Sequence, residues 1–133
     1  MKPITITLPI PDRAVSPNAK YGNSRFAAIC KSKKVKEHKQ RAFYIARDVL
    51  YPDGTSSPLW NAEWAGYSLA FFFKTAAFRD DDNADASCKS YRDGIAKAIG
   101  IDDKGFKKLK LSTHAKDAKN PRVEITIYPK EQQ

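Results

Sequence analysis

Apolar residues recur at helical spacing through a polar, lysine-rich stretch that runs from about Ser32 to Leu50. The positions on this stripe are Val35, His38, Ala42, Ile45, Ala46, Val49 and Leu50. Because such spacing places one stripe along a helix, the stretch predicts an amphipathic helix with a basic outer face. We interpret His38 as a packing residue of the stripe rather than as a ligand.

Strand patterns lie on both sides of this helix. Apolar and polar residues alternate over residues 4–8 and again over residues 123–127, and residues 66–73 are aromatic and β-prone. Leu109 and Leu111 indicate one more strand, and residues 76–80 are expected to continue the aromatic one. Between residues 9 and 25 the chain is rich in turn-forming residues, which predicts a long loop.

A second helical pattern extends over about residues 84–99, with Asp82 or Asn83 as the expected N-cap and Gly100 as the stop. The elements therefore alternate as strand, helix, strand, helix, strand, strand. This order predicts an α+β fold, in which a mixed or antiparallel sheet carries two main helices. The 133 residues form one domain of ordinary size, so we expect a single domain over residues 1–133.

The composition bears on the cellular compartment in which the protein is expected. It has no apolar signal region at its start and no apolar run of the ~20 residues that span a bilayer. We therefore expect a cytoplasmic protein that makes no membrane contact. Cys30 and Cys88 are isolated, without Cys-x-x-Cys spacing, and are expected to be buried thiols rather than zinc ligands.

Four aspartates occur within six residues, at Asp80, Asp81, Asp82 and Asp85, in a chain whose formal net charge is +9. Carboxylates this close repel one another unless a cation lies among them. If the run continues a strand, Asp80 and Asp82 share one face and form half of a site for Mg²⁺ or Mn²⁺. The pair Asp102–Asp103, in the loop beyond the second helix, would complete it.

The positive charge is concentrated in two blocks. The first contains Lys31, Lys33, Lys34, Lys36, Lys39 and Arg41, and the second contains Lys104, Lys107, Lys108, Lys110, Lys116, Lys119 and Arg122. A single block of this kind is usually a solvated face that keeps a protein soluble. Two blocks on either side of an acidic cluster favour a surface that binds nucleic-acid phosphates, with phosphodiester hydrolysis as the chemistry.

Two less specific interpretations stay open at this point. Asp85, Lys89 and Asp93 stand at i, i+4 and i+8, and could form only a surface ion-pair ladder. The acidic run could be an exposed helix cap, because the helix dipole favours carboxylates at an N-terminus. Lys89 could equally contact a scissile phosphate or the attacking water.

Several spaced motifs resemble the RusA family of Holliday junction resolvases. These are Arg79-Asp80-Asp81-Asp82-Asn83, Lys89-Ser90-Tyr91-Arg92-Asp93-Gly94-Ile95 and Gly100-Ile101-Asp102-Asp103, preceded by Leu8-Pro9-Ile10-Pro11 and Ser16-Pro17-Asn18-Ala19. The resemblance covers nearly the whole chain. One departure is that Lys89 follows Asn83 by six residues, whereas the best-known members have a shorter spacing.

The resemblance implies a Mg²⁺-dependent endodeoxyribonuclease, with Mn²⁺ able to substitute, that cleaves branched DNA as a homodimer. It implies that Asp80, Asp82 and Asp103 hold the metal and that Lys89 is the catalytic lysine. The side chains expected to contact DNA are Lys31, Lys33, Lys34, Lys36, Lys39, Arg41, Arg79, Lys104, Lys107 and Lys108. Two alternatives are a non-catalytic nucleic-acid-binding protein and a nuclease that acts on flaps or RNA.

Overall fold

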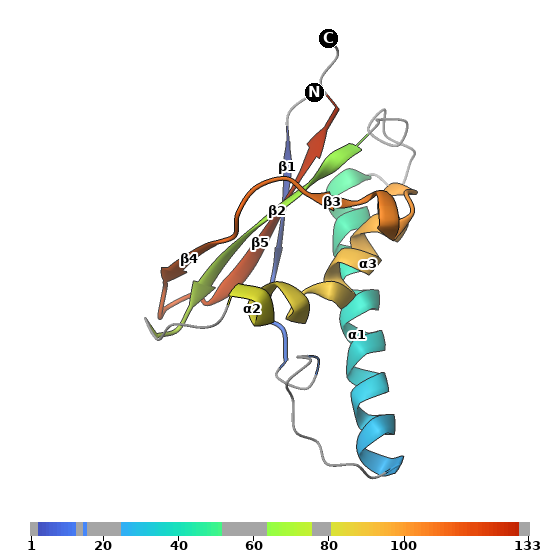
Figure 1. The fold of residues 1–133 in the computed structure, drawn as a ribbon, viewed down its shortest axis with the longest axis vertical. Helices are drawn as coiled ribbons and strands as arrows, with labels where there is room; N and C mark the ends of the chain where they lie inside the picture. The colour runs from blue at the N-terminus through green and yellow to red at the C-terminus, as the bar shows by residue number, and fades with distance from the viewer. Residues whose placement is uncertain (1–2, 13–14, 16–24, 52–63, 76–80, 131–133) are drawn as a thin grey trace.

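A computed structural model describes residues 3–12, 15, 25–51, 64–75 and 81–130, and of residues 81–83 and 103 it describes the backbone alone. The elements (Figure 1) are β1 (Ile4–Leu8), α1 (Arg25–Leu50), β2 (Trp64–Phe73), α2 (Asp81–Ser87), α3 (Lys89–Ile99), the 3₁₀ turn η3 (Asp103–Gly105), β3 (Lys107–Lys108), β4 (Thr113–Lys116) and β5 (Arg122–Pro129). The predicted α+β fold with a mixed sheet and two main helices is confirmed.

The sheet is built around β2 and β5. Strand β5 lies between β1 and β2 and is antiparallel to both, so that Ile125 pairs with Ile6 on one side and with Leu69 on the other. The far edge of β2 pairs in parallel first with β3 and then with β4. A parallel return of this kind needs a crossover, and α2 with α3 supplies it.

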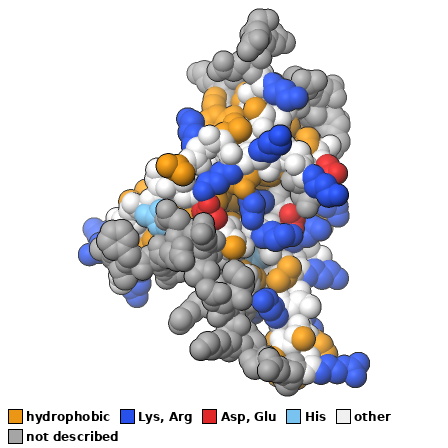
Figure 2. All heavy atoms as spheres, in the orientation of Figure 1, with side chains coloured by type: hydrophobic (Ala, Val, Ile, Leu, Met, Phe, Trp, Pro, Cys, Tyr) orange, Lys and Arg blue, Asp and Glu red, His pale blue; other side chains and the backbone are white. Residues whose placement is uncertain are grey.

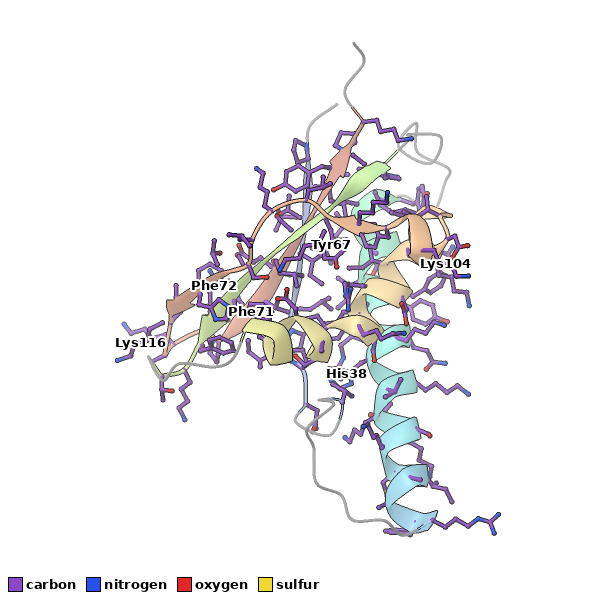
Figure 3. All side chains as sticks on the ribbon, viewed as in Figure 1. His38, Tyr67, Phe71, Phe72, Lys104 and Lys116 are labelled. Atoms are coloured by element: carbon purple, nitrogen blue, oxygen red, sulfur yellow. The ribbon has the colours of Figure 1, made fainter. Side chains whose placement is uncertain are left out.

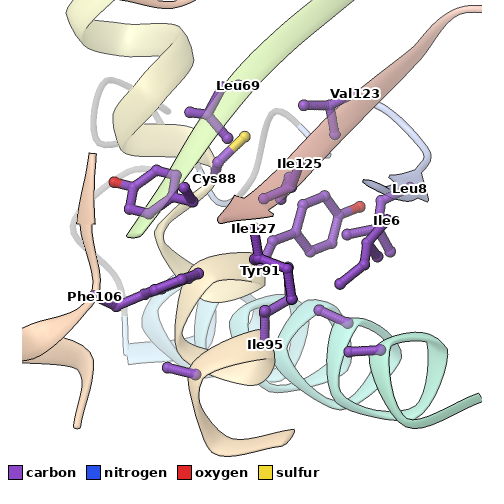
Figure 4. Close-up of a cluster of buried hydrophobic side chains, with 14 of the residues drawn as sticks. Ile6, Leu8, Leu69, Cys88, Tyr91, Ile95, Phe106, Val123, Ile125 and Ile127 are labelled. Atoms are coloured by element: carbon purple, nitrogen blue, oxygen red, sulfur yellow. The ribbon is translucent and has the colours of Figure 1, made fainter. Parts of the chain in front are cut away.

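The core lies between the sheet and the helices. Alternate residues of β1, β2 and β5 turn the same way and are buried, among them Leu8, Leu69 and Ile125. Tyr91 and Ile95 of α3, each 0% exposed, pack against this layer (Figure 4). The stripe of α1 contributes Ala42, Ala46 and Leu50 to the same cluster.

His38 belongs to this packing, as its place on the stripe predicted. The side chain is 5% exposed, and its ring stacks on that of Tyr91 at 5.2 Å between centroids. Its Nε2 accepts a hydrogen bond from the Asp12 amide at 3.0 Å, and its Nδ1 donates to the Lys34 carbonyl at 2.8 Å. These two hydrogen bonds make His38 a structural link between α1 and the segment after β1.

The first helix is longer than its pattern predicts, because α1 begins at Arg25 rather than near Ser32. Its N-terminal half projects past the edge of the sheet (Figure 1). Of residues 25–37 only Ala27 is buried, and Phe26 and Ile29 are exposed. Val35 and Val49 of the predicted stripe are exposed, whereas His38, Ala42, Ala46 and Leu50 are buried. The stripe therefore marks mainly the half of the helix that packs.

The second helical pattern is divided in two. The chain turns at Cys88, where the Cys88 amide donates to the carbonyl of Asp85 and the helix restarts as α3. Helix α2 begins at Asp81. Asp82 and Asn83 therefore lie within its first turn and are not its N-cap, which corrects the prediction. The stop at Gly100 is confirmed, since its φ of 76° is a left-handed conformation that suits glycine.

Three other expectations have mixed outcomes. Leu109 and Leu111 are exposed and lie between β3 and β4 rather than in a strand. Cys88 is buried, as expected, whereas Cys30 is only partly buried. The expected continuation over residues 76–80, and the loop residues 13–14 and 16–24, lie outside the described residues.

Among the described helices, none combines the length and the apolar character that crossing a membrane requires.

Candidate functional site

The acidic run leads directly into α2. Asp82 lies in the first turn of this helix, and Asp80 and Arg79 lie outside the described residues. The expectation that Asp80 and Asp82 alternate along a strand is therefore wrong for Asp82, because successive helical residues turn by about 100° rather than 180°. No described group of three or more His, Cys, Asp or Glu side chains could hold a metal ion, but the side chains of Asp80, Asp82 and Asp103 are not among those described.

Asp82 and Asp103 flank α3. Helix α2 leads into its N-terminal end at Lys89, and η3 begins with Asp103 shortly after its C-terminal end at Ile99. Eleven helical residues span about 16 Å. Ligands of one Mg²⁺ each lie about 2 Å from the ion, a short distance compared with the length of the helix that separates the two segments.

Lys89 is the first residue of α3, and its side chain is 70% exposed. Its Nζ lies 3.3 Å from Oδ2 of Asp93, which forms the second half of the predicted ion-pair ladder. An exposed pair at this spacing contributes only about 0.3 to 0.5 kcal/mol, so it does not lock Lys89 in place. The first half of the ladder, a contact between Asp85 and Lys89, is absent among the described contacts, because the turn at Cys88 directs Asp85 toward the edge of the sheet.

Asp85 instead ties α2 to the edge of the sheet. Its Oδ1 accepts a hydrogen bond from Ser112 Oγ at 2.6 Å, and its Oδ2 forms an ion pair with Lys108 Nζ. Lys108 pairs with Tyr67 across β2 and β3, so both side chains lie on the helix-facing side of the sheet. These contacts join residues 23 and 27 positions apart, and the sequence spacing gave no indication of them.

A second contact that the sequence pattern does not indicate lies beside the first. Arg92 of α3 donates from Nη1 to Tyr67 Oη at 2.8 Å, and its Cζ lies 5.6 Å from the centre of the Tyr67 ring. Figure 3 shows Tyr67 between the sheet and α3. Nearby, burial raises the pKa of the Cys88 thiol to about 12 and leaves it protonated at neutral pH.

The basic blocks are partly free and partly paired. In the first block Lys33, Lys36, Lys39 and Arg41 are exposed. Lys34 lies 3.7 Å from Glu37 and 3.9 Å from Asp12, and Lys31 is partly buried. The projecting half of α1 therefore presents Lys33 and Lys36 without an ion-pair partner among the described residues, whereas Arg41 hydrogen-bonds to Tyr91.

The second block is spread over the molecule rather than gathered in one patch. Lys104 and Lys116 lie at opposite sides of the view in Figure 3. Arg122 is engaged by Asp117 at 2.8 Å and Glu124 at 3.0 Å, and its Cζ lies 3.9 Å from the Phe72 ring centre. Figure 2 shows Lys and Arg side chains gathered over α3 and the segment after it, with a few carboxylates among them.

A bacterial protein is similar in sequence to this chain. No protein-family model matches the chain. The chain is similar to an uncharacterized protein of Xylella fastidiosa (strain Temecula1 / ATCC 700964), with 37% identity over 112 residues. The match covers 77% of this chain and 61% of that protein, so the chain spans about three fifths of the relative's length.

Proposed function

We propose that the chain is a Mg²⁺-dependent endodeoxyribonuclease of the RusA type, which cleaves branched DNA as a homodimer in the cytoplasm. The observation that carries the proposal is the position of Lys89. It is exposed at the start of α3, directly after the short helix that carries the acidic run, in a chain of net charge +9. An exposed cation beside clustered carboxylates on a basic protein is suited to phosphodiester hydrolysis.

Asp80, Asp82 and Asp103 are the proposed ligands of the ion, and Mn²⁺ is expected to replace Mg²⁺ because both prefer carboxylate oxygens. When bound, such an ion activates a water and neutralises charge that develops at phosphorus. Lys89 adds positive charge at the same phosphate. Its weak exposed pairing with Asp93 leaves its ammonium group able to turn toward a substrate.

The homodimer gives Asp103 a way to join the other two ligands. Within one chain, α3 holds Asp82 and Asp103 at opposite ends. A two-fold axis can place the Asp103 end of one subunit against the Asp82 end of its partner, and it then builds two equal sites at once. Two such sites match a four-way junction, which offers two symmetry-related strands for cutting.

DNA would be held through its phosphates. The exposed lysines of α1 would form one contact surface, and Lys104, Lys107 and Lys108 would form another, in which Asp85 holds Lys108 close to the acidic run. Arg79, which lies outside the described residues, is expected to contact DNA as well. Phosphate contacts of this kind position a duplex without reading its sequence. They suit an enzyme that recognises the shape of a branch.

The test offers the purified protein a four-way junction, a flap, a linear duplex and RNA side by side, with Mg²⁺, with Mn²⁺ and with EDTA. The proposal expects metal-dependent cuts that are fastest in the junction. Cleavage mainly of flaps or RNA would keep the nuclease and change its substrate. Binding without cleavage in either metal would contradict the proposal.

A second candidate is a non-catalytic nucleic-acid-binding protein. It is favoured by one observation, namely that Asp81 and Asp82 occupy the first turn of α2, where the helix dipole stabilises carboxylates. In that case the aspartates would serve the helix alone. Their replacement would then lower stability rather than remove an activity.

A further inference from the structure

Arg92 carries a positive charge that no described carboxylate neutralises. Its hydrogen-bonded side-chain partner is the phenol of Tyr67, which is neutral, and its Nε is buried without a hydrogen-bond partner. The neighbouring cations are paired differently, since Lys108 is bound by Asp85 and Lys89 by Asp93. Arg92 is thus a partly buried guanidinium with unfilled donor capacity.

Such an arrangement is costly unless an anion neutralises the charge, and because Nε is buried the anion has to approach through the terminal nitrogens of the guanidinium. A charged group removed from water loses hydration, and a donor left without an acceptor adds to that cost. The guanidinium is nevertheless held in one orientation, because Tyr67 Oη accepts from Nη1 and the Tyr67 ring lies under Cζ. Tyr67 itself is 3% exposed, so its position is fixed by the core.

The surroundings indicate which anion would fit. Lys89 stands three residues before Arg92 and therefore on the same side of α3. Lys108 lies opposite Tyr67 in the neighbouring strand and is held by Asp85, the last aspartate of the acidic run. The planar fork of a guanidinium matches the oxygens of a phosphate, and the exposed, weakly paired ammonium group of Lys89 on the same side of the helix adds to the attraction for a phosphate chain.

We propose that Arg92, supported by Tyr67, binds a backbone phosphate of the nucleic acid and positions the strand beside the acidic run. Arg92 is a positioning residue in this account. The proposal rests on the proposed function for the identity of the ligand, but it concerns binding alone and holds even if the protein does not cleave DNA.

The test measures junction binding by fluorescence anisotropy in EDTA, at several salt concentrations. Arg92→Gln should weaken binding roughly ten- to a hundredfold. It should also lower the slope of log affinity against log salt by about 0.9, the contribution of one phosphate contact. Arg92→Lys should keep the slope because it keeps the charge. Lys97→Gln, which removes a charge from the exposed C-terminal end of the same helix, is the matched control and should change neither quantity.

Two further measurements separate a binding role from a structural one. The melting temperature of Arg92→Gln should equal or exceed that of the wild type, because the variant removes an unneutralised charge. A lower melting temperature with an unchanged salt slope in both Arg92 variants would make Arg92 structural and overturn the proposal. A last comparison adds inorganic phosphate, with chloride at equal ionic strength as the control. If phosphate stabilises the wild type but not Arg92→Gln, while the salt slope of DNA binding is the same in both proteins, the site binds a free anion. In that case the strand-positioning role is wrong.

The outcome is distinguishable from a failure of the nuclease assignment. A reduced slope in Arg92→Gln together with no metal-dependent cleavage would retain this site and remove the nuclease. Metal-dependent cleavage together with an unchanged salt slope in Arg92→Gln would retain the nuclease assignment and remove this phosphate site.

Discussion

Gly94 of α3 faces the carbonyl oxygen of Lys39 in α1 so closely that a Cβ at position 94 would collide with that oxygen. The same Cβ would lie 3.1 Å from the Cβ of Ala42 and 3.1 Å from the amide nitrogen of Phe43. The two helices therefore cross with their backbones nearly in contact. This crossing holds α3, and with it Lys89 and Arg92, against the rest of the fold.

Gly94→Ala is expected to destabilise the protein. Alanine improves helix propensity by about 1 kcal/mol, but the collision is with backbone atoms that cannot rotate away, and overpacking of this kind costs about 1 to 3 kcal/mol. Because the collision is with backbone, the cost should lie at the upper end of that range, which leaves a net loss of about 2 kcal/mol and a fall of several degrees in the melting temperature. Gly105→Ala is the control, because nothing lies within 4 Å of its added Cβ. Equal melting of both variants would show that the helices are not in close contact.

The buried thiol of Cys88 predicts sensitivity to alkali. Burial raises its pKa from 9.0 to about 12, so the folded state keeps the thiol protonated where the unfolded chain ionises it. This contribution is fully present below pH 9 and is lost as the pH rises toward 12. The free energy of unfolding should fall by about 1.4 kcal/mol per pH unit in that window. Denaturant unfolding at pH 8, 9 and 10 measures it.

The comparison variant for this experiment is Cys88→Ala. It has a lower stability at neutral pH because it leaves a small cavity, but it lacks the thiol that ionises. Its stability should therefore change less between pH 8 and pH 10 than that of the wild type. Parallel curves for the two proteins would mean that Cys88 is not protected from ionisation.

The projecting half of α1 should contribute to DNA binding through unpaired lysines. Lys33 and Lys36 are exposed and have no ion-pair partner among the described residues, whereas Lys34 is paired with Asp12 and Glu37. Replacing Lys33 and Lys36 by Ala should lower the salt slope of binding by up to about 1.8. Lys34→Ala alone should change it less, because that charge is already partly neutralised. An unchanged slope in the double variant would place the DNA on another surface.

Much of this architecture could be predicted from the sequence, and the omissions have physical causes. Alternation located β1 and β5, and the helical stripe located the part of α1 that packs. The projecting start of α1 buries almost nothing, so it leaves no periodic signal. The two- and four-residue strands β3 and β4 are wholly exposed and form only because the edge of β2 is available to pair with them.

The contacts of the candidate site also differ in whether the sequence predicts them. The contact between Lys89 and Asp93 is local and follows from a spacing of four residues. The contacts of Arg92 with Tyr67 and of Asp85 with Lys108 join separate elements, 25 and 23 residues apart, and they depend on the register of the sheet. The turn at Cys88 decides that Asp85 points to the sheet edge, and nothing in the apolar pattern marks that turn.

The proposed sharing of ligands across a dimer predicts complementation between inactive variants. Asp82→Asn and Asp103→Asn should each fail to nick junction DNA alone. If one subunit supplies Asp82 and its partner supplies Asp103, a mixed dimer keeps one intact site. Random mixing in equal amounts should then restore about a quarter of the wild-type sites. If each subunit supplied all its own ligands, mixing would restore nothing.

The most direct test of the nuclease account compares cutting with binding in Asp82→Asn. The account predicts that Mg²⁺-dependent cleavage of a four-way junction falls by more than about 100-fold, while junction binding persists or tightens because one repelling charge is gone. Asp81→Asn, which changes the neighbouring aspartate outside the proposed ligand set, should keep cleaving. Undiminished cleavage by Asp82→Asn, or an equal loss of cleavage and binding, would contradict the account.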